Sequence, residues 1–314
     1  MTVTKEKAKQ ILALLDSDIQ AAQPALEKAV ALARRQQASL TLYVNAWSAA
    51  LERRMAHDRA QLPALSEALI SAWENNLRHQ LDTLDAPDTE TLIVWESAEK
   101  QTLIDLLLTR QPDLLVLNRS SEPALQRWLM TPRDWRMIRK APCAVLCVGE
   151  QPWPAQPAVL AALDPDTDSD ERAALNDRII AAARQLANDL SGQLSLAQVV
   201  EYPDETLVML AGEAVPVSLN DVDNLRHYYR QRLQETAQHY QLGADQALLL
   251  EGAPHRALAE QMESHPGVLV LGTVHRGAVK RLLLGNTAEQ ILLHSRSDVL
   301  VVKPDDFVSP WVAQ

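Results

Sequence analysis

Short apolar runs alternate with amphipathic stretches along the whole chain. The apolar runs of the first half have the length of buried strands and lie at residues 11–15, 40–44, 91–95, 113–117 and 144–148. Between them apolar residues recur at helical spacing, as Leu26, Val30 and Ala33 do. After residue 157 the pattern restarts, with runs at 159–163, 194–200, 247–250, 268–271 and 299–302. Continuous apolar strands that alternate with helices predict an α/β protein whose parallel sheets are covered on both faces.

The second half of the chain repeats the first. Residues 112–117 match residues 266–271 at an offset of 154. Asp16 and Asp164, which follow the first strand of each half, align at an offset of 148, so only a short net insertion separates the halves. Self-similarity of this kind is typical of a duplicated domain. Both aspartates fall at the carboxyl end of a strand, which is where ligands bind to parallel sheets.

A proline-containing stretch, residues 149–157, separates the two halves. It has three prolines in nine residues, which is typical of a stiff, extended linker. We therefore predict two tandem domains and a linker, at residues 1–149, 158–314 and 150–157.

The composition limits the kind of partner. The 314 residues carry a formal net charge of −11, which disfavours binding to nucleic acid or to anionic lipid. No apolar run approaches the ~18 residues of a membrane span, and the first residues lead straight into a strand pattern. We expect a cytoplasmic protein with no nucleic-acid and no membrane partner. Cys143 and Cys147 are expected to be reduced core thiols and not metal ligands.

The stretch with the most chemistry follows the apolar run at residues 268–271. Its candidate binding residues are Gly272, Thr273, His275, Arg276, Gly285, Asn286 and Thr287. Glycines let backbone amides approach a ligand closely, and a helix N-terminus presents free N–H groups to an anion. The order of strand, glycine-bearing loop and helix start therefore predicts the place where a phosphate would bind.

A strand that ends in Asp, the glycine-bearing loop, and the run from Lys280 to Glu289 that leads into Val299–Pro304 resemble a universal stress protein domain. Two such domains in one chain resemble the tandem, UspE-like members of that family. The resemblance implies Rossmann-like, adenine nucleotide alpha hydrolase-like domains, each with a five-stranded parallel sheet. It also implies an internal pseudo-dimer of the two domains, with a further homodimer left open.

The resemblance further implies an adenine nucleotide, ATP, ADP or AMP with Mg²⁺, in the C-terminal domain. The nucleotide-binding positions that it implies are Asp164, Val199, Gly272, Thr273, His275, Arg276, Gly285, Asn286 and Thr287. Two positions depart from the family's pattern, because His275 stands where a glycine is expected and Asn286 where Ser or Thr is expected. In the N-terminal half Asn118, Ser121 and Thr131 align with Gly272, His275 and Gly285. We therefore expect that half to lack the site.

Several of these positions have a second interpretation. Gly272 and Gly285 could serve only to permit a positive φ, and Asn286 and Thr287 could serve only as a helix cap. Helix starts are also predicted at Thr131-Pro132 and, through a capping box of Asp168 and Glu171, after the second Asp-ended strand.

No nucleophile elbow, HExxH or Walker loop occurs in the chain, so we expect a stress-response regulatory or protective binding module and not an enzyme, with slow ATP hydrolysis left open. The alternative is a nucleotide-free module. It would bind an apolar metabolite or a partner protein through the domain cleft and the apolar insert at residues 203–220. A true ATPase ranks last, because no catalytic base is identifiable.

Overall fold

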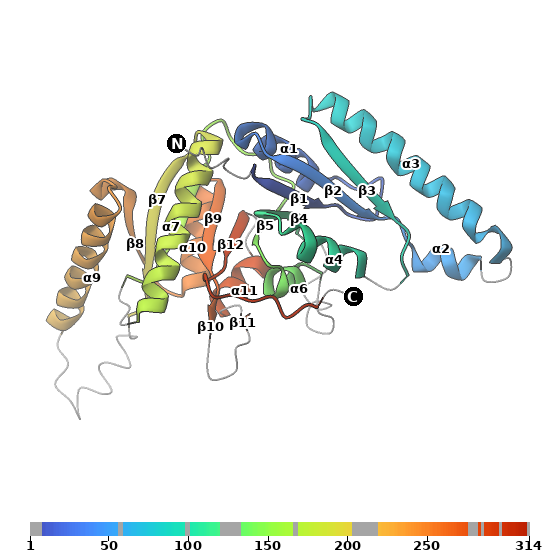
Figure 1. The fold of residues 1–314 in the computed structure, drawn as a ribbon. Coiled ribbons are helices and arrows are strands. Elements are labelled where there is room, and N and C mark those ends of the chain that lie inside the picture. Colours follow the sequence, from blue (N-terminus) through green and yellow to red (C-terminus); the bar gives the residue numbers. More distant parts are fainter. Residues whose placement is uncertain are drawn as a thin grey trace, which may run out of the picture. The chain divides into compact units, whose positions relative to one another are not determined.

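The chain forms two compact units, which we call unit 1 and unit 2 (Figure 1). Unit 1 comprises Met1–Pro152 together with Phe307–Gln314, and unit 2 comprises Trp153–Asp306. The exact limits of the two predicted domains stay a prediction. The computed structural model describes residues 8–55, 59–97, 101–119, 133–165, 169–202, 219–275, 282–283, 286–294 and 297–312.

Unit 1 contains a five-stranded parallel sheet. Its strands are β1 (Gln10–Leu14), β2 (Ser39–Asn45), β3 (Thr89–Val94), β4 (Leu114–Asn118) and β5 (Ala144–Val148). They lie in the order β3-β2-β1-β4-β5 and pair in parallel. The chain runs outward from β1 through β2 to β3 and then returns to β4 on the other side of β1. The topological switch point, where such sheets bind ligands, therefore lies between β1 and β4.

Helices cover both faces of this sheet. They are α1 (Pro24–Gln36), α2 (Ala49–Arg54), α3 (Leu62–Thr83), α4 (Gln101–Arg110) and α6 (Arg133–Lys140), with a 3₁₀ turn at Arg59–Gln61. Right-handed crossovers put α1 and α3 on one face and α4 and α6 on the other. Helix α3 begins at Leu62, so that Pro63 lies in its first turn. Proline is tolerated there because the missing N–H would have no intrahelical acceptor.

Unit 2 repeats this sheet. Its strands are β6 (Ala158–Ala162), β7 (Gln193–Val200), β8 (Ala247–Glu251), β9 (Gly267–Gly272) and β12 (Asp298–Val302). They lie in the order β8-β7-β6-β9-β12 and pair in parallel. After β9 a short antiparallel pair forms between β10 (Val274–His275) and β11 (Leu282–Leu283).

The helices of unit 2 are α7 (Asp170–Leu190), α9 (Leu219–His239), α10 (Pro254–Ser264) and α11 (Asn286–His294), with a 3₁₀ turn at Ala244–Gln246. The predicted capping box of Asp168 and Glu171 is wrong. The helix begins at Asp170, and its N-cap is Ser169, whose side chain accepts a hydrogen bond from the Arg172 N–H. A residue caps only when it directly precedes the first helical residue. Asp168, Thr131 and Pro132 lie outside the described residues.

The two sheets share one strand register. Ile11 of β1 pairs with Leu114 of β4, and Val159 of β6 pairs with Val268 of β9, at the positions that the sequence repeat aligns. Most of the buried side chains in each unit are aliphatic, and Tyr43, Trp73 and Trp135 are also buried in unit 1. The predicted fold class, two tandem α/β units with a five-stranded parallel sheet each, is confirmed.

Two details complete unit 1. Cys143 and Cys147 are both buried and form no disulfide, as expected for core thiols. The hydroxyl of Ser309 donates a hydrogen bond to the carbonyl of Lys140, the last residue of α6, at 2.7 Å. The segment from Phe307 onward is therefore a part of unit 1, although it follows the last strand of unit 2 in the sequence.

Candidate functional site

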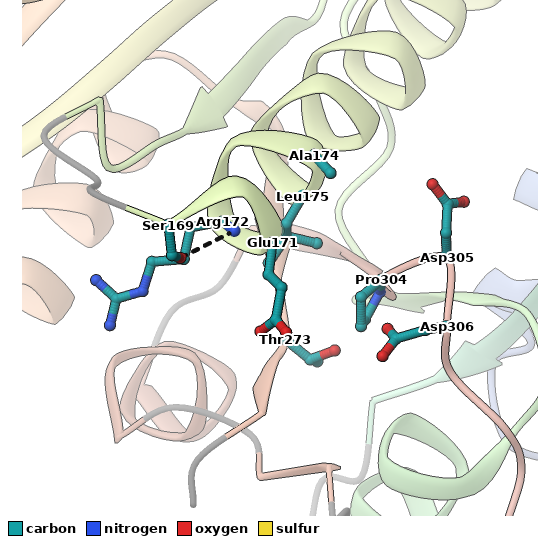
Figure 2. Close-up of a pocket in the computed structure, with 9 residues that line it drawn as sticks. All are labelled: Ser169, Glu171, Arg172, Ala174, Leu175, Thr273, Pro304, Asp305 and Asp306. Carbon is teal, nitrogen blue, oxygen red and sulfur yellow. Dashed lines mark hydrogen bonds between the residues drawn. The ribbon is translucent and has the colours of Figure 1, made fainter.

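A cavity of about 330 Å³ lies in unit 2 at the carboxyl ends of β9 and β12, beside the N-terminus of α7 (Figure 2). Its lining residues are Ser169, Glu171, Arg172, Ala174, Leu175, Thr273, Pro304, Asp305 and Asp306. Sites at the carboxyl ends of parallel strands, near the switch point, are where doubly wound sheets bind ligands. The volume lies at the lower end of the range for small-molecule sites.

The first turn of α7 forms one wall of the cavity. Ser169 accepts the Arg172 N–H with its hydroxyl at 3.4 Å and with its carbonyl at 3.1 Å, and the same carbonyl accepts the Ala173 N–H. The amides of Asp170 and Glu171 have no acceptor among the residues that the structure describes. A helix N-terminus with free N–H groups attracts a hydrogen-bond acceptor or an anion. The amides at this end of α7 are therefore available to a ligand that accepts hydrogen bonds.

Thr273 forms part of the opposite wall. It is completely buried, and its N–H and its hydroxyl both donate to the carbonyl of Val302, at 3.0 and 3.4 Å. These two bonds join the residue after β9 to the end of β12. Thr273 therefore holds the edge of the sheet in place beneath the cavity.

The charge of the lining is mainly negative, with three carboxylates and one guanidinium. In Figure 2 Glu171 extends toward Thr273, while Arg172 points away from the cavity. The Arg172 guanidinium lies 3.6 Å from the carboxylate of Asp164, and Asp305 forms an ion pair with Arg178. A lining of this kind favours the hydroxyl and amino groups of a ligand over a cluster of phosphates.

Gly272 has a packing role that the sequence did not indicate. A Cβ atom at this position would lie 2.8 Å from side-chain atoms of both Leu175 and Ile179 on α7. Its φ lies outside the left-handed region, so the predicted alternative of a positive φ is wrong for this glycine. Glycine is needed here because α7 lies directly on β9.

The other predicted binding residues are spread over this end of unit 2. Asp164 follows β6 and is exposed, and its carbonyl accepts the Asn176 side-chain amide at 2.8 Å. Val199 is half-buried in β7, where it pairs with Leu250 of β8, and does not line the cavity. His275 lies in β10, while Asn286 and Thr287 are the first two residues of α11. Arg276 and Gly285 lie outside the described residues.

Thr273 is thus the predicted residue that lines the cavity, with Gly272 packed behind it. The sequence reasoning missed the first turn of α7 and the segment that follows β12, at residues 304–306. The signal for the first of these was present, because a serine followed by two acidic residues is typical of a helix start. Pro304 belongs to the segment that carries the family resemblance, but nothing in the sequence marked Asp305 and Asp306 as cavity residues.

Two further properties concern the whole of the described chain. None of its helices combines the length and the apolar character needed to span a membrane. Its described residues also contain no group of three or more His, Cys, Asp or Glu side chains that could hold a metal ion.

Two parallel sheets in tandem, each with its switch point beside the first strand, and a cavity at the strand carboxyl ends define a doubly wound, Rossmann-like α/β protein. The sequence profile of the Universal stress protein family matches residues 7–149 and 158–303. The chain belongs to the universal stress protein family, with two of its domains in tandem.

Relatives of known name agree with this assignment. The chain is 26% identical over 295 residues to Universal stress protein E of Escherichia coli (strain K12), a match that covers 92% of each chain. It is 25% identical over 307 residues to the Universal stress protein E homolog of Haemophilus influenzae, covering 95% of this chain and 98% of the relative. The crystal structure of a putative universal stress protein from Pseudomonas aeruginosa UCBPP-PA14 is similar with a TM-score of 0.70 and 26% identity, over 96% of this chain and 95% of that one.

Proposed function

We propose that this universal stress protein is a regulatory or protective binding module that takes up an adenine nucleotide in unit 2. The observation that carries the proposal is the cavity at the carboxyl ends of β9 and β12, which contains Thr273 and the open N-terminus of α7. Family membership over both halves supports the same class of function. The proposed compartment is the cytoplasm.

The cavity fits one part of a nucleotide better than the other. About 330 Å³ and three lining carboxylates suit the hydroxyl and amino groups of a nucleoside. The phosphates, with Mg²⁺, would then lie toward His275 and the start of α11 at Asn286 and Thr287, where Arg276 and Gly285 also lie in the sequence. Asp164 and Val199 would contact the nucleoside from the ends of β6 and β7.

Binding without efficient catalysis is the proposed activity. Among the residues that line the cavity, the nucleophilic groups are the hydroxyls of Ser169 and Thr273, and both are engaged with the backbone of the protein. None of the described residues that line the cavity is a histidine, and the groups there that could act as a base are the carboxylates of Glu171, Asp305 and Asp306. A carboxylate is ordinarily a weaker base than an imidazole, so hydrolysis of a bound nucleotide is expected to be slow.

The proposal is tested by filling the cavity. Ala174 lines it and is exposed on α7, so Ala174→Phe places a ring in the cavity without disturbing the core. Adenosine, AMP and Mg-ATP should each be added to the parent at ~100 Kd, where binding raises the melting temperature by roughly 5–10 °C. Ala174→Phe should abolish that shift.

Ala181→Phe is the matched control, because Ala181 is exposed on the same helix and does not line the cavity. The control should keep the full shift. A parent protein that no adenine compound stabilises, and that releases no nucleotide when it is denatured after purification, would refute the proposed function.

A second candidate is a nucleotide-free module that binds an apolar metabolite or a partner protein. The negative lining of the cavity disfavours phosphates, and Gly272, a main element of the nucleotide pattern, is required by packing against Leu175 and Ile179. Most of the apolar insert at residues 203–220 lies outside the described residues. Mass spectrometry of the small molecules released on denaturation separates the two candidates. The internal pseudo-dimer and the further homodimer stay predictions. Light scattering on the purified chain would check the homodimer.

A further inference from the structure

Three buried polar side chains gather at the ligand-binding end of the sheet in unit 1. Gln23, Lys28 and Asn118 expose 4%, 5% and 9% of their surface. Gln23 is the N-cap of α1, Lys28 is the fifth residue of α1, and Asn118 is the last residue of β4. The Lys28 ammonium donates to the carbonyl of Gly149 just after β5, at 2.8 Å. Burying polar groups is costly unless they are hydrogen-bonded, so their arrangement needs an explanation.

Asn118 occupies the position in unit 1 that Gly272 occupies in unit 2. Leu117 pairs with Leu14 in β1, and the aligned residue of β9 is Leu271, so the next residue is Asn118 in one unit and Gly272 in the other. In unit 2 this position lies under the side chains of Leu175 and Ile179. In unit 1 it lies under the N-terminus of α1.

The carboxamide of Asn118 is bonded on both sides. Its Oδ1 accepts the N–H of Ala25, in the first turn of α1, at 2.7 Å. Its Nδ2 donates to Gln23 Oε1 at 3.0 Å, and the same oxygen accepts the Asp16 N–H at 3.0 Å. The Gln23 amide in turn donates to the carbonyl of Asp18 at 3.2 Å. The loop after β1, the end of β4 and the start of α1 are therefore joined by two carboxamides.

These bonds leave α1 with no free donor in its first turn. Pro24 has no N–H, Ala25 donates to Asn118, and the amides of Leu26 and Glu27 both donate to the carbonyl of Gln23, at 2.9 and 3.4 Å. The start of α7 differs, because its first two amides have no acceptor among the described residues. A ligand that needs donors from a helix N-terminus finds them in unit 2 and not in unit 1.

We infer that the ligand-binding end of unit 1 is permanently occupied by the protein's own carboxamides, with Asn118 as a built-in ligand of the α1 N-terminus. Unit 1 therefore stays closed to outside ligands whatever unit 2 binds. It follows that removing the Asn118 side chain creates a small polar site that takes a primary amide of the same shape.

The test is chemical rescue in the full chain. Asn118→Gly removes a fragment with the shape of acetamide. It leaves the Ala25 N–H without its acceptor and removes one of the two donors to Gln23 Oε1. Its melting temperature should fall by roughly 4–8 °C. Acetamide should raise the melting temperature of Asn118→Gly by more than it raises that of the parent. It should also slow hydrogen exchange in peptides of the variant that contain Ala25.

Leu117→Ala is the matched control, because Leu117 is the fully buried preceding residue of β4 and its loss leaves an apolar cavity. It should be destabilised and should not respond to acetamide. If Asn118→Gly does not fold, Asn118→Ala with formamide repeats the test with a smaller fragment. The inference is wrong if the amide stabilises neither Asn118 variant more than it stabilises Leu117→Ala.

Discussion

One position, shared by Asn118 and Gly272, shows how a single residue can set the character of a whole unit. Both residues end the fourth strand of a sheet and face the first helix. In unit 1 the helix starts close to this position, and a carboxamide reaches its first turn. In unit 2 the sixth and tenth residues of α7, Leu175 and Ile179, cover the position, so no side chain fits. The part of the first helix that lies over the position thus decides which residue is acceptable.

This packing predicts a specific coupling between Gly272 and Leu175. Gly272→Ala should destabilise unit 2 by about 1–3 kcal/mol, because the added methyl group overpacks the contact between α7 and β9. Leu175→Ala alone should also destabilise, by about 2–5 kcal/mol, because it leaves a cavity. The double variant should be more stable than the sum of the two losses predicts. Denaturant unfolding of the four proteins measures this coupling, and additive losses would contradict the packing role.

At the scale of elements, α7 is the helix that organises unit 2. Its N-terminus lines the cavity, its middle packs on β9, and it is tied to the end of α9 by Tyr240. The Tyr240 hydroxyl donates to the Asp177 carboxylate at 2.6 Å. Burial raises the pKa of Tyr240 above its ordinary value, and the hydrogen bond to Asp177 raises it further. The neutral phenol is therefore favoured in the folded state.

This pKa shift predicts an alkaline limit to stability. Because the folded-state pKa is raised, the contribution of Tyr240 is fully present below the unfolded pKa of about 10 and is lost as pH rises through the higher folded pKa. Tyr240→Phe should cost about 1 kcal/mol at neutral pH and should flatten the fall in stability above pH ~10. Urea unfolding of the parent and of Tyr240→Phe across pH measures both effects, and an alkaline fall that Tyr240→Phe leaves unchanged would contradict the role of this tyrosine.

At the scale of the whole molecule, the two units share one topology and one strand register, but the starts of their first helices are hydrogen-bonded differently. In unit 1 the first amides of α1 donate to groups of the protein itself. In unit 2 the first two amides of α7 have no acceptor among the described residues. Duplication of a domain permits this, because the residues at the strand ends of the two copies can change independently. The arrangement assigns the two halves of the chain different proposed roles.

Hydrogen exchange would measure this difference in ligand binding between the two units. A saturating nucleotide, at ~100 Kd, stabilises the unit that binds it by about 2.7 kcal/mol. Added protection should therefore appear in peptides from α7, β9 and β12, and not in peptides from α1, β1 and β4. Equal protection of both units would contradict the closed state of unit 1. Protection of unit 1 alone would contradict the proposed site as well.

The architecture of this protein could be predicted from its sequence. Apolar runs of strand length, helical spacing between them and the repeat at an offset of 154 are local or pairwise features, and the ten predicted strands all appear in the two sheets. The departure of Asn118 from Gly272 was also visible in the aligned halves. Helix boundaries were less certain, as the start at Ser169 shows, because competing polar residues offer several caps.

The meaning of those residues depended on the tertiary structure. Asn118 bonds to Ala25, 93 positions away, and Gly272 is needed because of Leu175 and Ile179, which belong to another element. The cavity joins α7 to residues that follow β9 and β12. Contacts between segments far apart in sequence leave no local pattern, because they arise only when the sheet brings the carboxyl ends of its strands to one edge. The alternation of strands and helices therefore determined the fold, and the packing of α1 and α7 on that edge decided whether the first amides of each helix find an acceptor within the described protein.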